Sequence, residues 1–354
     1  MANDPKPHAL DRRSFLKTST AVAGAAIIGS GAGTATAADG LDHRNERPDR
    51  MQYRKLGRTN FSCSTLVFGC GAALRDSKAV RLLERAYDQG VNHFDVGRTY
   101  KGSEAAMAPF MKRHQGDIWV TSKGPARASD SLGPDDAVTV DHAKAAARYW
   151  TTQLEESLTA MDAEYVDAYY LMGVNNPGIV KSEEAANAFA AARDAGKVGH
   201  FGISTHERAE ECLEAAIEVG WYSLAMIAIT PSGWYDYRDR ALRKGTANLR
   251  EIQPVLKRAS DAGIGLVGMK AARHIALDPY GGRYGDNERQ DIEATKAFDI
   301  HYSEKFLQAP LSAFQRSYAY VLENGIDVVN ADMQNFKHFE ENLVATRDSG
   351  KYFA

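Results

Sequence analysis

The amino-acid sequence predicts an α/β fold in which eight parallel strands, each followed by a helix, close into a barrel. Short apolar runs alternate with helical patterns eight times along the chain. The apolar runs lack the polar alternation of half-exposed strands, as is typical of strands buried on both faces. The turn at residues 68–73 is a poor match to the Gly-x-Gly-x-x-Gly turn that an open doubly wound sheet needs. A closed parallel (β/α) barrel, the TIM-barrel architecture, is therefore favoured.

The predicted elements follow one another without a linker after residue 50, so residues 51–354 are predicted to form one barrel domain. The strand-like runs are, in chain order, residues 66–69, 91–95, 118–121, 166–171, 198–203, 224–229, 265–269 and 326–329. The helical patterns are residues 78–89, 103–113, 141–161, 183–195, 207–219, 249–262, 312–323 and, closing the chain, 336–346.

Two connections are longer than the others. Residues 126–140 form a polar loop after the third strand, and residues 271–311 form a long connection after the seventh. The second contains the glycine- and tyrosine-rich segment 279–285, in which glycine permits hinging and tyrosine can cover a ring or a sugar. Long connections of this kind are often lids, and a solvated or oligomer-contacting excursion is the alternative.

The three parts of a signal peptide occupy residues 1–37. Arg12 and Arg13 lie in a charged segment, an apolar run follows at 21–28, and small residues form a cleavage site at the end. The paired arginines followed by Ser-Phe-Leu-Lys resemble a twin-arginine export signal, and the apolar run is shorter than the about 20 residues that span a bilayer. We expect cleavage after residue 37, a linker at 38–50, and an exported protein, periplasmic or extracellular, that uses the twin-arginine machinery. A basic disordered tail is the alternative.

Net charge and cysteine content indicate which kinds of partner and metal site the sequence predicts. The net charge is −3, and it becomes −5 without residues 1–37, which carry four basic and two acidic side chains. Such a balance gives no indication of nucleic-acid binding or of an anionic membrane partner. Cys63, Cys70 and Cys212 are widely spaced and contain no Cys-x-x-Cys, so they predict neither an iron–sulfur cluster nor a zinc site. A disulfide would have to use Cys63 or Cys70, with a partner that the sequence does not identify.

Three reactive side chains converge on the carboxyl-end rim of the predicted barrel. Asp95 ends the second strand, Tyr100 lies in the loop after it, and Lys123 ends the third strand. The chemistry of such barrels takes place at this rim. A tyrosine with a pKa of about 10 is a poor acid or base at neutral pH, but a nearby ammonium stabilises the phenolate and lowers that pKa. We therefore expect Tyr100 to be a general acid/base, with Lys123 lowering its pKa and Asp95 holding Lys123.

The same residues resemble a family motif. Residues 94–104, with the pattern Phe-Asp-x-x-x-x-Tyr-x-Gly-Ser-Glu, and residues 121–123, Thr-Ser-Lys, resemble the aldo-keto reductases, in which this Asp, Tyr and Lys belong to a catalytic tetrad. The resemblance begins at residues 51–59, which are similar to the opening hairpin of the family, and continues to residues 341–343. It implies an eight-stranded parallel (β/α) TIM barrel of aldo-keto reductase type that uses a nicotinamide cofactor.

The resemblance also implies cofactor contacts. Ser204, in Gly-Ile-Ser after the fifth strand, matches the serine that contacts the nicotinamide carboxamide. The pair Met269 and Lys270 resembles the end of the seventh strand in one bacterial branch of the family. The segment after the eighth strand resembles the phosphate and adenine segment and contributes Met333, Gln334, Lys337, Glu341 and Asn342, the last two facing the adenine. The resemblance makes NADP the expected cofactor, but NAD stays open because Gln334 stands where an arginine for the 2′-phosphate is frequent.

The fourth strand departs from the family pattern. The histidine of the family polarises the substrate carbonyl and helps to select the substrate, and Met172 occupies its position here. A thioether is a weak acceptor and cannot donate a proton. Asn175 and Asn176, just beyond, offer either an amide donor or loop capping. The predicted tetrad is therefore a triad with a methionine.

The sixth strand departs as well. Met226 and Ile229 stand where the family has a glutamine and a tyrosine that stacks on the nicotinamide. Trp234 and Tyr235 follow closely enough to offer an aromatic face to a substrate.

Three functions are consistent with these residues. The first is an NAD(P)-dependent oxidoreductase that acts on a small carbonyl, alcohol or sugar-like compound. The second is a barrel that binds nucleotide or ligand but has lost efficient turnover. The third is a sugar lyase or isomerase with Tyr100 and Lys123 as acid and base. The sequence identifies neither the substrate nor the oligomeric state, because differences of one methylene or hydroxyl are worth only about 1 to 3 kcal/mol.

Overall fold

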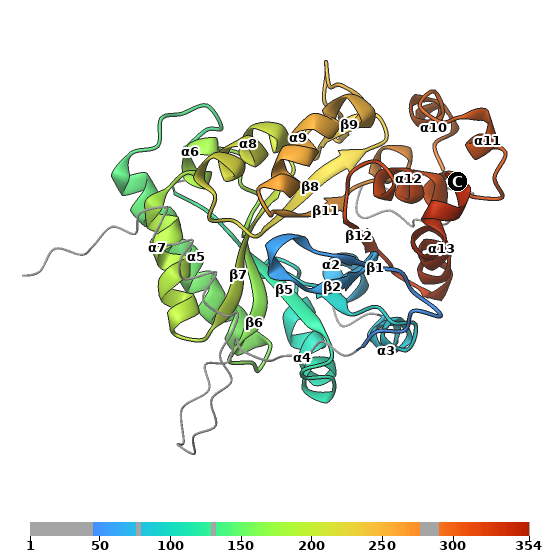
Figure 1. Cartoon of the computed structure of the whole chain (residues 1–354). Helices are drawn as coiled ribbons and strands as arrows, with labels where there is room; N and C mark the ends of the chain where they lie inside the picture. Colours follow the sequence, from blue (N-terminus) through green and yellow to red (C-terminus); the bar gives the residue numbers. More distant parts are fainter. Residues whose placement is uncertain (1–44, 76–78, 129–131, 277–289, 354) are drawn as a thin grey trace, which may run out of the picture.

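The computed structural model describes residues 45–75, 79–128, 132–276 and 290–353 (Figure 1). Within them, eight parallel strands close into a barrel, because β12 pairs with β3 and β7 pairs with β8. The strands, in the order in which they pair around the barrel, are β3 (Leu66–Gly69), β4 (His93–Asp95), β5 (Trp119–Pro125), β6 (Val166–Met172), β7 (Val198–Thr205), β8 (Leu224–Thr230), β11 (Gly265–Met269) and β12 (Val328–Asp332). The predicted fold class and each predicted strand are confirmed.

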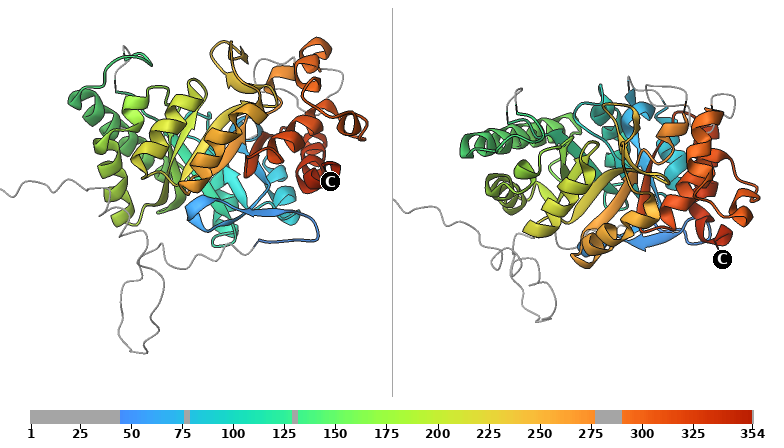
Figure 2. Two further views of the ribbon diagram at one scale, coloured as in Figure 1. Left: turned by 45° about the horizontal axis from the view of Figure 1, so that its top comes forward. Right: turned by 90° about the horizontal axis from the view of Figure 1, so that it is seen from above.

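Helices surround the barrel on its outer face (Figures 1 and 2). Those that follow the eight strands are α2 (Cys70–Ala73) with α3 (Arg81–Asp88), α4 (Ser103–Arg113), α5 (Val140–Ala160), α6 (Pro177–Val180) with α7 (Glu183–Asp194), α8 (Ala209–Val219), α9 (Leu249–Asp261), α12 (Ala313–Leu322) and α13 (Phe336–Arg347). Each predicted helix is present with ends shifted by at most a few residues. Three long helices begin at capping boxes, headed by Thr139, Asn248 and Ser312, so their starts are fixed by local side-chain bonds.

The alternation of side chains along each strand separates two apolar cores. On β6, Ala168 and Tyr170 belong to the cluster that fills the barrel interior, whereas Tyr169 and Leu171 belong to the larger cluster between the barrel and the helices. Successive strand residues point to opposite faces. Met172 at the end of β6 is therefore in phase with the interior residues, at the carboxyl-end rim.

A hairpin closes the opposite end of the barrel. Strands β1 (Tyr53–Lys55) and β2 (Ser62–Ser64) pair antiparallel, as the opening segment predicted, with the 3₁₀ turn η1 (Gly57–Thr59) between them. Arg58 donates to the carbonyl oxygens of Gly220, Ala262 and Gly263, which precede the starts of β8 and β11. Gly57 has a φ of +52°, and a Cβ there would lie 2.2 Å from the backbone nitrogen of Gly265, so this contact requires glycine.

A second hairpin extends β8 at the carboxyl-end rim. Strand β9 (Gly233–Asp236) pairs antiparallel with β8, and β10 (Ala241–Leu242) pairs with β9. This excursion extends the chain beyond the end of β8 (Figure 1), and Tyr237, which follows β9, lines the cavity described below.

The connection 271–311 is not the structureless loop that its composition suggests. Its described part contains η3 (Arg273–Ile275), α10 (Ile292–Asp299) and α11 (Glu304–Leu307), and the two α-helices bury Phe298 and Phe306 while Ile292 and Leu307 stay exposed. The lid segment 279–285 and the signal segment 1–37 lie outside the described residues. The chain ends in a short 3₁₀ turn, η5 (Ser349–Tyr352).

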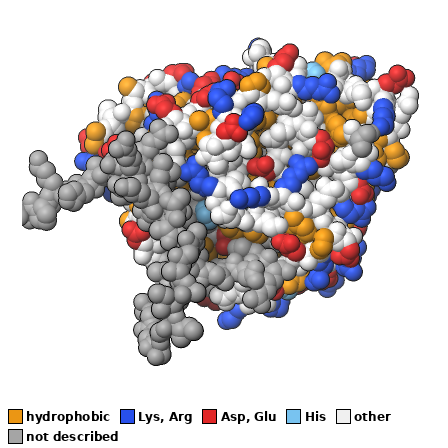
Figure 3. Space-filling view, viewed as in Figure 1, with side chains coloured by type: hydrophobic (Ala, Val, Ile, Leu, Met, Phe, Trp, Pro, Cys, Tyr) orange, Lys and Arg blue, Asp and Glu red, His pale blue; other side chains and the backbone are white. Residues whose placement is uncertain are grey.

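The described residues include all three cysteines and can be searched for a metal site or a membrane-spanning helix. Cys63, Cys70 and Cys212 are buried and free. Across the described ranges, no group of three or more His, Cys, Asp or Glu side chains could hold a metal ion. None of the helices in these ranges is both long enough and apolar enough to cross a bilayer. Acidic and basic side chains are intermingled on the face shown in Figure 3.

Candidate active site

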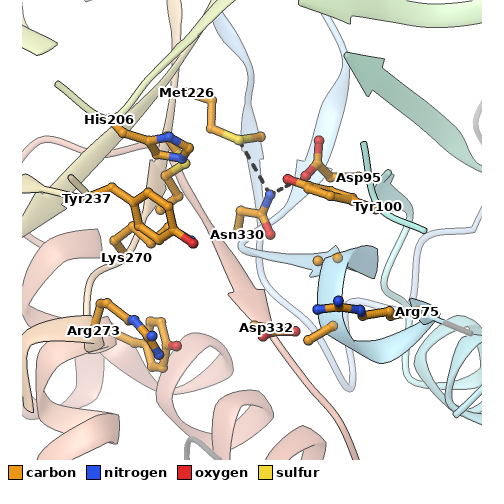
Figure 4. A pocket seen from close by; sticks show the side chains of 15 residues that line it. Arg75, Asp95, Tyr100, His206, Met226, Tyr237, Lys270, Arg273, Asn330 and Asp332 are labelled. Carbon is orange, nitrogen blue, oxygen red and sulfur yellow. Dashed lines mark hydrogen bonds between the residues drawn. The ribbon is translucent and has the colours of Figure 1, made fainter. Parts of the chain in front are cut away.

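A cavity of about 190 Å³ opens at the carboxyl-end rim of the barrel (Figure 4). Its walls come from the ends of five strands and from the loops that follow them, as expected for this architecture. Four residues predicted for the site, Asp95, Tyr100, Met269 and Lys270, line it. A volume of this size accommodates a small molecule or one part of a dinucleotide rather than a whole one.

Asp95 and Lys123 form a buried ion pair at the floor of this cavity. The Lys123 Nζ atom lies 2.5 Å from Asp95 Oδ2 and 2.8 Å from the carbonyl oxygen of Val96. Burial alone would lower the pKa of Lys123, but Asp95 and Tyr100 outweigh burial and raise it, so the side chain is an ammonium. Asp95 thus holds Lys123 charged and in place, as its position in the sequence suggests.

Tyr100 lies above this pair. The Lys123 Nζ atom is 4.9 Å from the centroid of the Tyr100 ring, and the ring is packed against Gly97 and Gly71, where a Cβ would lie 3.2 Å and 3.3 Å from its edge. Burial raises the pKa of Tyr100, and the opposing effect of Lys123 does not reverse that shift. The expectation of a lowered pKa is therefore wrong for the protein alone, because burial exceeds the effect of the ammonium. Tyr100 is a protonated phenol at neutral pH.

Asn330 is a site residue that the sequence did not reveal. It ends the apolar run of β12, lines the cavity, and donates from Nδ2 to Asp95 Oδ2 at 2.6 Å, with Met226 Sδ at 3.6 Å (Figure 4). Its hydrogen bond lowers the pKa of Asp95, whereas burial raises it. Asn330 therefore helps to keep Asp95 ionised, and so acts through Asp95 as a positioning residue. A polar residue at the end of an apolar strand was the available signal.

Replacing Asn330 by alanine is expected to raise the pKa of Asp95 further, since a donor to its charged form is lost. A hydrogen bond to a charged group contributes about 1.5 to 3 kcal/mol, so the acid limb of the pH profile of kcat should move upward by on the order of 1 unit. The measurement is the pH dependence of kcat for the variant and for Met226→Leu, which touches the same amide without supplying a donor and should leave the limb in place. An unmoved limb in the alanine variant would remove Asn330 from this role.

An aromatic wall faces Tyr100 across the cavity. His206 lies in the loop after β7, and its ring centroid is 5.0 Å from that of Tyr237, which follows β9 (Figure 4). Burial, with smaller effects of Lys270 and Lys123, lowers the pKa of His206 to about 3, so its imidazole is neutral. Neither residue was predicted. His206 could have been found from its place two residues after Ser204, whereas Tyr237 depends on the β9–β10 excursion.

Charged side chains gather where the segments that follow β3 and β11 and the end of β12 line the cavity. Lys270, Arg273 and Arg75 bring positive charge, and Asp332 brings a carboxylate (Figure 4). Burial lowers the pKa of Lys270 to about 8, against the opposing effect of Asp332. Burial raises the pKa of Asp332 to about 7, while Lys270 and hydrogen bonds to the backbone of Ala72 and Met333 oppose this shift.

The other predicted cofactor residues occupy different depths. Ser204 is 1% exposed, and its hydroxyl makes no hydrogen bond within the described part of the chain. Asn342 is fully buried on α13, and both atoms of its amide group lack partners there as well. Glu341 accepts a hydrogen bond from Ser312.

The remaining predicted cofactor residues follow β12 and differ in exposure. Met333 is buried, Gln334 is half-buried, and Lys337 is exposed in the first turn of α13. The structure thus buries Ser204 near the end of β7, outside the lining of the cavity, and leaves Lys337 at the surface.

Met172 lies beside Ser204 in the register of β6 and β7, and its Sδ atom accepts from the Thr99 hydroxyl at 3.5 Å. No histidine replaces it on β6. Asn176 caps α6 and donates to the carbonyl oxygens of Gly133 and Asp136, so loop capping accounts for it.

The two aromatic residues predicted for the substrate do not line the cavity. Trp234 is 2% exposed, belongs to the outer core and donates from its indole nitrogen to Glu210 at 2.7 Å. The reason is the antiparallel register of β9, which pairs Trp234 with Ile229, another outward residue. Tyr235 points to the barrel interior and packs in the cluster that contains Met226 and Met269. The aromatic residue after β9 that lines the cavity is Tyr237, which is 40% exposed.

The chain matches known proteins over different extents. The Aldo/keto reductase family model matches residues 65–346. A stretch of 179 residues is 29% identical to the L-glyceraldehyde 3-phosphate reductase of Escherichia coli K12, covering 48% of this chain and 50% of that protein, so the chain spans about half the length of the curated relative.

Solved structures share the fold. An aldo-keto reductase from Bacillus halodurans in its holo form has a TM-score of 0.57 at 18% identity over 83% of this chain and 90% of that one. A thermostable aldo-keto reductase in complex with the inhibitor epalrestat has a TM-score of 0.55 at 20% identity over 84% of this chain and 94% of that one. The family match covers most of the chain and includes the strands that form the cavity. This protein belongs to the aldo/keto reductase family.

Proposed function

We propose that this protein is an NAD(P)-dependent reductase of small carbonyl or sugar-like compounds, with NADP as the cofactor. Membership of the family supports an oxidoreductase in general. The observation that carries the proposal is the buried Asp95–Lys123 pair beneath a protonated Tyr100 in a cavity at the barrel rim. The relative that acts on L-glyceraldehyde 3-phosphate supports a small hydroxylated aldehyde as the substrate class.

Two buried polar groups without partners in the described residues, together with Lys270 at the cavity, support a nicotinamide dinucleotide as the cofactor. The orphaned hydroxyl of Ser204 suits a carboxamide, and the orphaned amide of Asn342, beside Glu341, suits an adenine edge. Lys270, with Met269, Met333, Gln334 and Lys337, would complete the set along β11, β12 and α13. When bound, the nicotinamide would supply the hydride for reduction of a carbonyl.

The protein's own groups would handle the proton and the charge. Tyr100, held protonated by burial, would donate its hydroxyl proton to the substrate oxygen. Lys123 would stabilise the resulting phenolate, since its ammonium is fixed by Asp95 and lies over the phenol ring. Met172 contributes no proton, so the substrate oxygen would depend on Tyr100 and Lys123.

Two alternatives remain distinct from this proposal. A binding protein without turnover would keep the nucleotide, and a sugar lyase or isomerase would act without one. Purified protein mixed with NADPH and glyceraldehyde separates the three by nicotinamide absorbance and product analysis. Consumption of NADPH with formation of an alcohol supports the reductase. Binding of nucleotide without consumption supports the first alternative, and conversion of the aldehyde without nucleotide supports the second.

We also propose export through the twin-arginine pathway, with residues 1–37 as the signal and 51–354 as the exported barrel. That pathway carries folded proteins, which suits a cargo that must take up a nucleotide before it leaves. Replacing both Arg12 and Arg13 by lysine is expected to leave folded, full-length protein in the cytoplasm, because the pathway reads the arginine pair. Fractionation followed by mass determination measures this. Normal export and processing of the variant would contradict the proposal.

A further inference from the structure

Lys123 and Lys270 lie near the same cavity but differ in the partners that their amines contact. Lys123 is 1% exposed and is held by Asp95 and by the Val96 carbonyl oxygen. Lys270 follows β11, lines the cavity, and has its Nζ atom 4.9 Å from the centroid of the Tyr237 ring. Among the residues that the structure describes, no hydrogen-bond acceptor or ion-pair partner contacts the Lys270 amine.

The backbone of Lys270 is also unusual. Its φ is +66°, in the left-handed region that a residue with a side chain rarely adopts. A turn fixes it there, because the Arg273 N–H donates to the Lys270 carbonyl oxygen at 2.8 Å. Strained backbone of this kind concentrates at functional sites. The turn therefore sets the direction in which this side chain leaves the end of β11.

The surroundings of Lys270 disfavour its ammonium form, chiefly through burial. Burial has the largest effect, and Arg273 and Lys123 add to it, while Asp332 and Asp95 oppose it. The pKa of about 8 that results leaves a larger fraction of the side chain as a neutral amine at pH 7 than in an ordinary lysine. A lysine whose pKa is lowered in this way, beside another cation, is a nucleophile toward carbonyl compounds.

We propose that Lys270 forms a Schiff base with small aldehydes and ketones that enter the cavity. The amine nitrogen adds to the carbonyl carbon, the new hydroxyl takes a proton from solvent and leaves as water, and a C=N bond replaces the C=O bond. No electrons are gained or lost, so no oxidant or reductant is needed. This activity lies beyond the proposed reductase. A protonated imine weakens the bonds at the neighbouring carbon, which is the chemistry of isomerases and lyases of hydroxylated carbonyl compounds.

The experiment traps the imine in the wild-type protein without nucleotide. Glycolaldehyde and cyanoborohydride at pH 7 convert each imine into a stable secondary amine, and peptide mass spectrometry gives the rate at each lysine. Lys270 is expected to react at least tenfold faster than the exposed Lys112, because its lowered pKa gives it a larger neutral fraction than an ordinary lysine has. Lys123 should stay unlabelled, since it is paired. Equal rates at Lys270 and Lys112 would overturn the proposal, and this comparison needs no variant.

Two variants sharpen the result. Lys270→Arg keeps the charge and should abolish trapping in that peptide alone. Asp332→Asn removes the carboxylate that favours the Lys270 ammonium, so the rise of labelling with pH should begin at lower pH than in wild type. A lysine that is merely accessible would show the same pH dependence in both proteins, and that result would also overturn the proposal. Because nucleotide is absent throughout, a failed trap leaves the proposed reductase untouched.

Discussion

Tyr100→Phe is expected to lower kcat for any reduced carbonyl substrate by roughly 10² to 10⁴-fold, the usual contribution of a general acid. The change removes one hydroxyl and keeps the ring that packs between Gly71 and Gly97 over Lys123. Binding of NADPH should therefore be unaffected, and the loss should appear in kcat rather than in the dissociation constant of the nucleotide. Steady-state kinetics and a fluorescence titration of the nucleotide measure the two quantities separately.

Tyr222→Phe is the matched control for this variant. Tyr222 is fully buried and donates to the carbonyl oxygen of Val180 at 2.7 Å, away from the cavity. Loss of the Tyr222 hydroxyl should lower the free energy of unfolding by about 1 kcal/mol and leave kcat within a factor of about two. Activity of the Tyr100 variant within about threefold of wild type would exclude Tyr100 as the proton donor.

Met172→His is expected to raise the turnover of a generic aldehyde at least tenfold. Met172 is in phase with the interior side chains of β6 and beside Ser204, so a histidine there would present an N–H at the barrel rim. In other enzymes, loss of one donor to a developing negative charge costs on the order of 2.7 to 4 kcal/mol, which sets the scale of the expected gain. The natural protein should reduce simple aldehydes weakly for the same reason. Initial rates of NADPH oxidation with a panel of aldehydes test this.

Met172→Leu conserves volume and apolarity and should change the rates little, because the thioether only accepts from Thr99. Nucleotide binding should be equal in both variants, since Ser204 and Asn342 do not depend on position 172. A histidine variant that binds nucleotide normally but stays inactive would favour the binding protein over the reductase.

Local patterns in the sequence were enough to predict the strands and the pairing of Asp95 with Lys123. Each strand of the barrel is a short apolar run, and residues that end neighbouring parallel strands must meet at one rim. Asn330 could not be assigned in this way, since its partner Asp95 is 235 positions away in the chain. The role of a polar residue in an apolar strand depends on its hydrogen-bond partner, and only the closed barrel brings that partner into contact.

The predictions for Trp234 and for the pKa of Tyr100 are wrong for reasons that lie in the tertiary structure. Trp234 was expected at the substrate because it follows β8 closely, but the antiparallel return of β9 turns it outward and brings Tyr237 to the cavity instead. The pKa of Tyr100 was expected to fall because Lys123 is near, but burial depends on the packing of the whole rim and has the larger effect. Register and burial are tertiary properties, so side-chain identity and spacing do not determine them.

The hairpin of β1 and β2 makes the two ends of the barrel suitable for different uses in the laboratory. It seals the end opposite the cavity, and Lys55 is exposed on it. All three native cysteines are buried, so Lys55→Cys would supply the one readily alkylated thiol in the described chain. Coupling through that thiol would fix the enzyme to an electrode or bead with its mouth toward the bulk solution, so that substrate and nucleotide reach every immobilised molecule without obstruction.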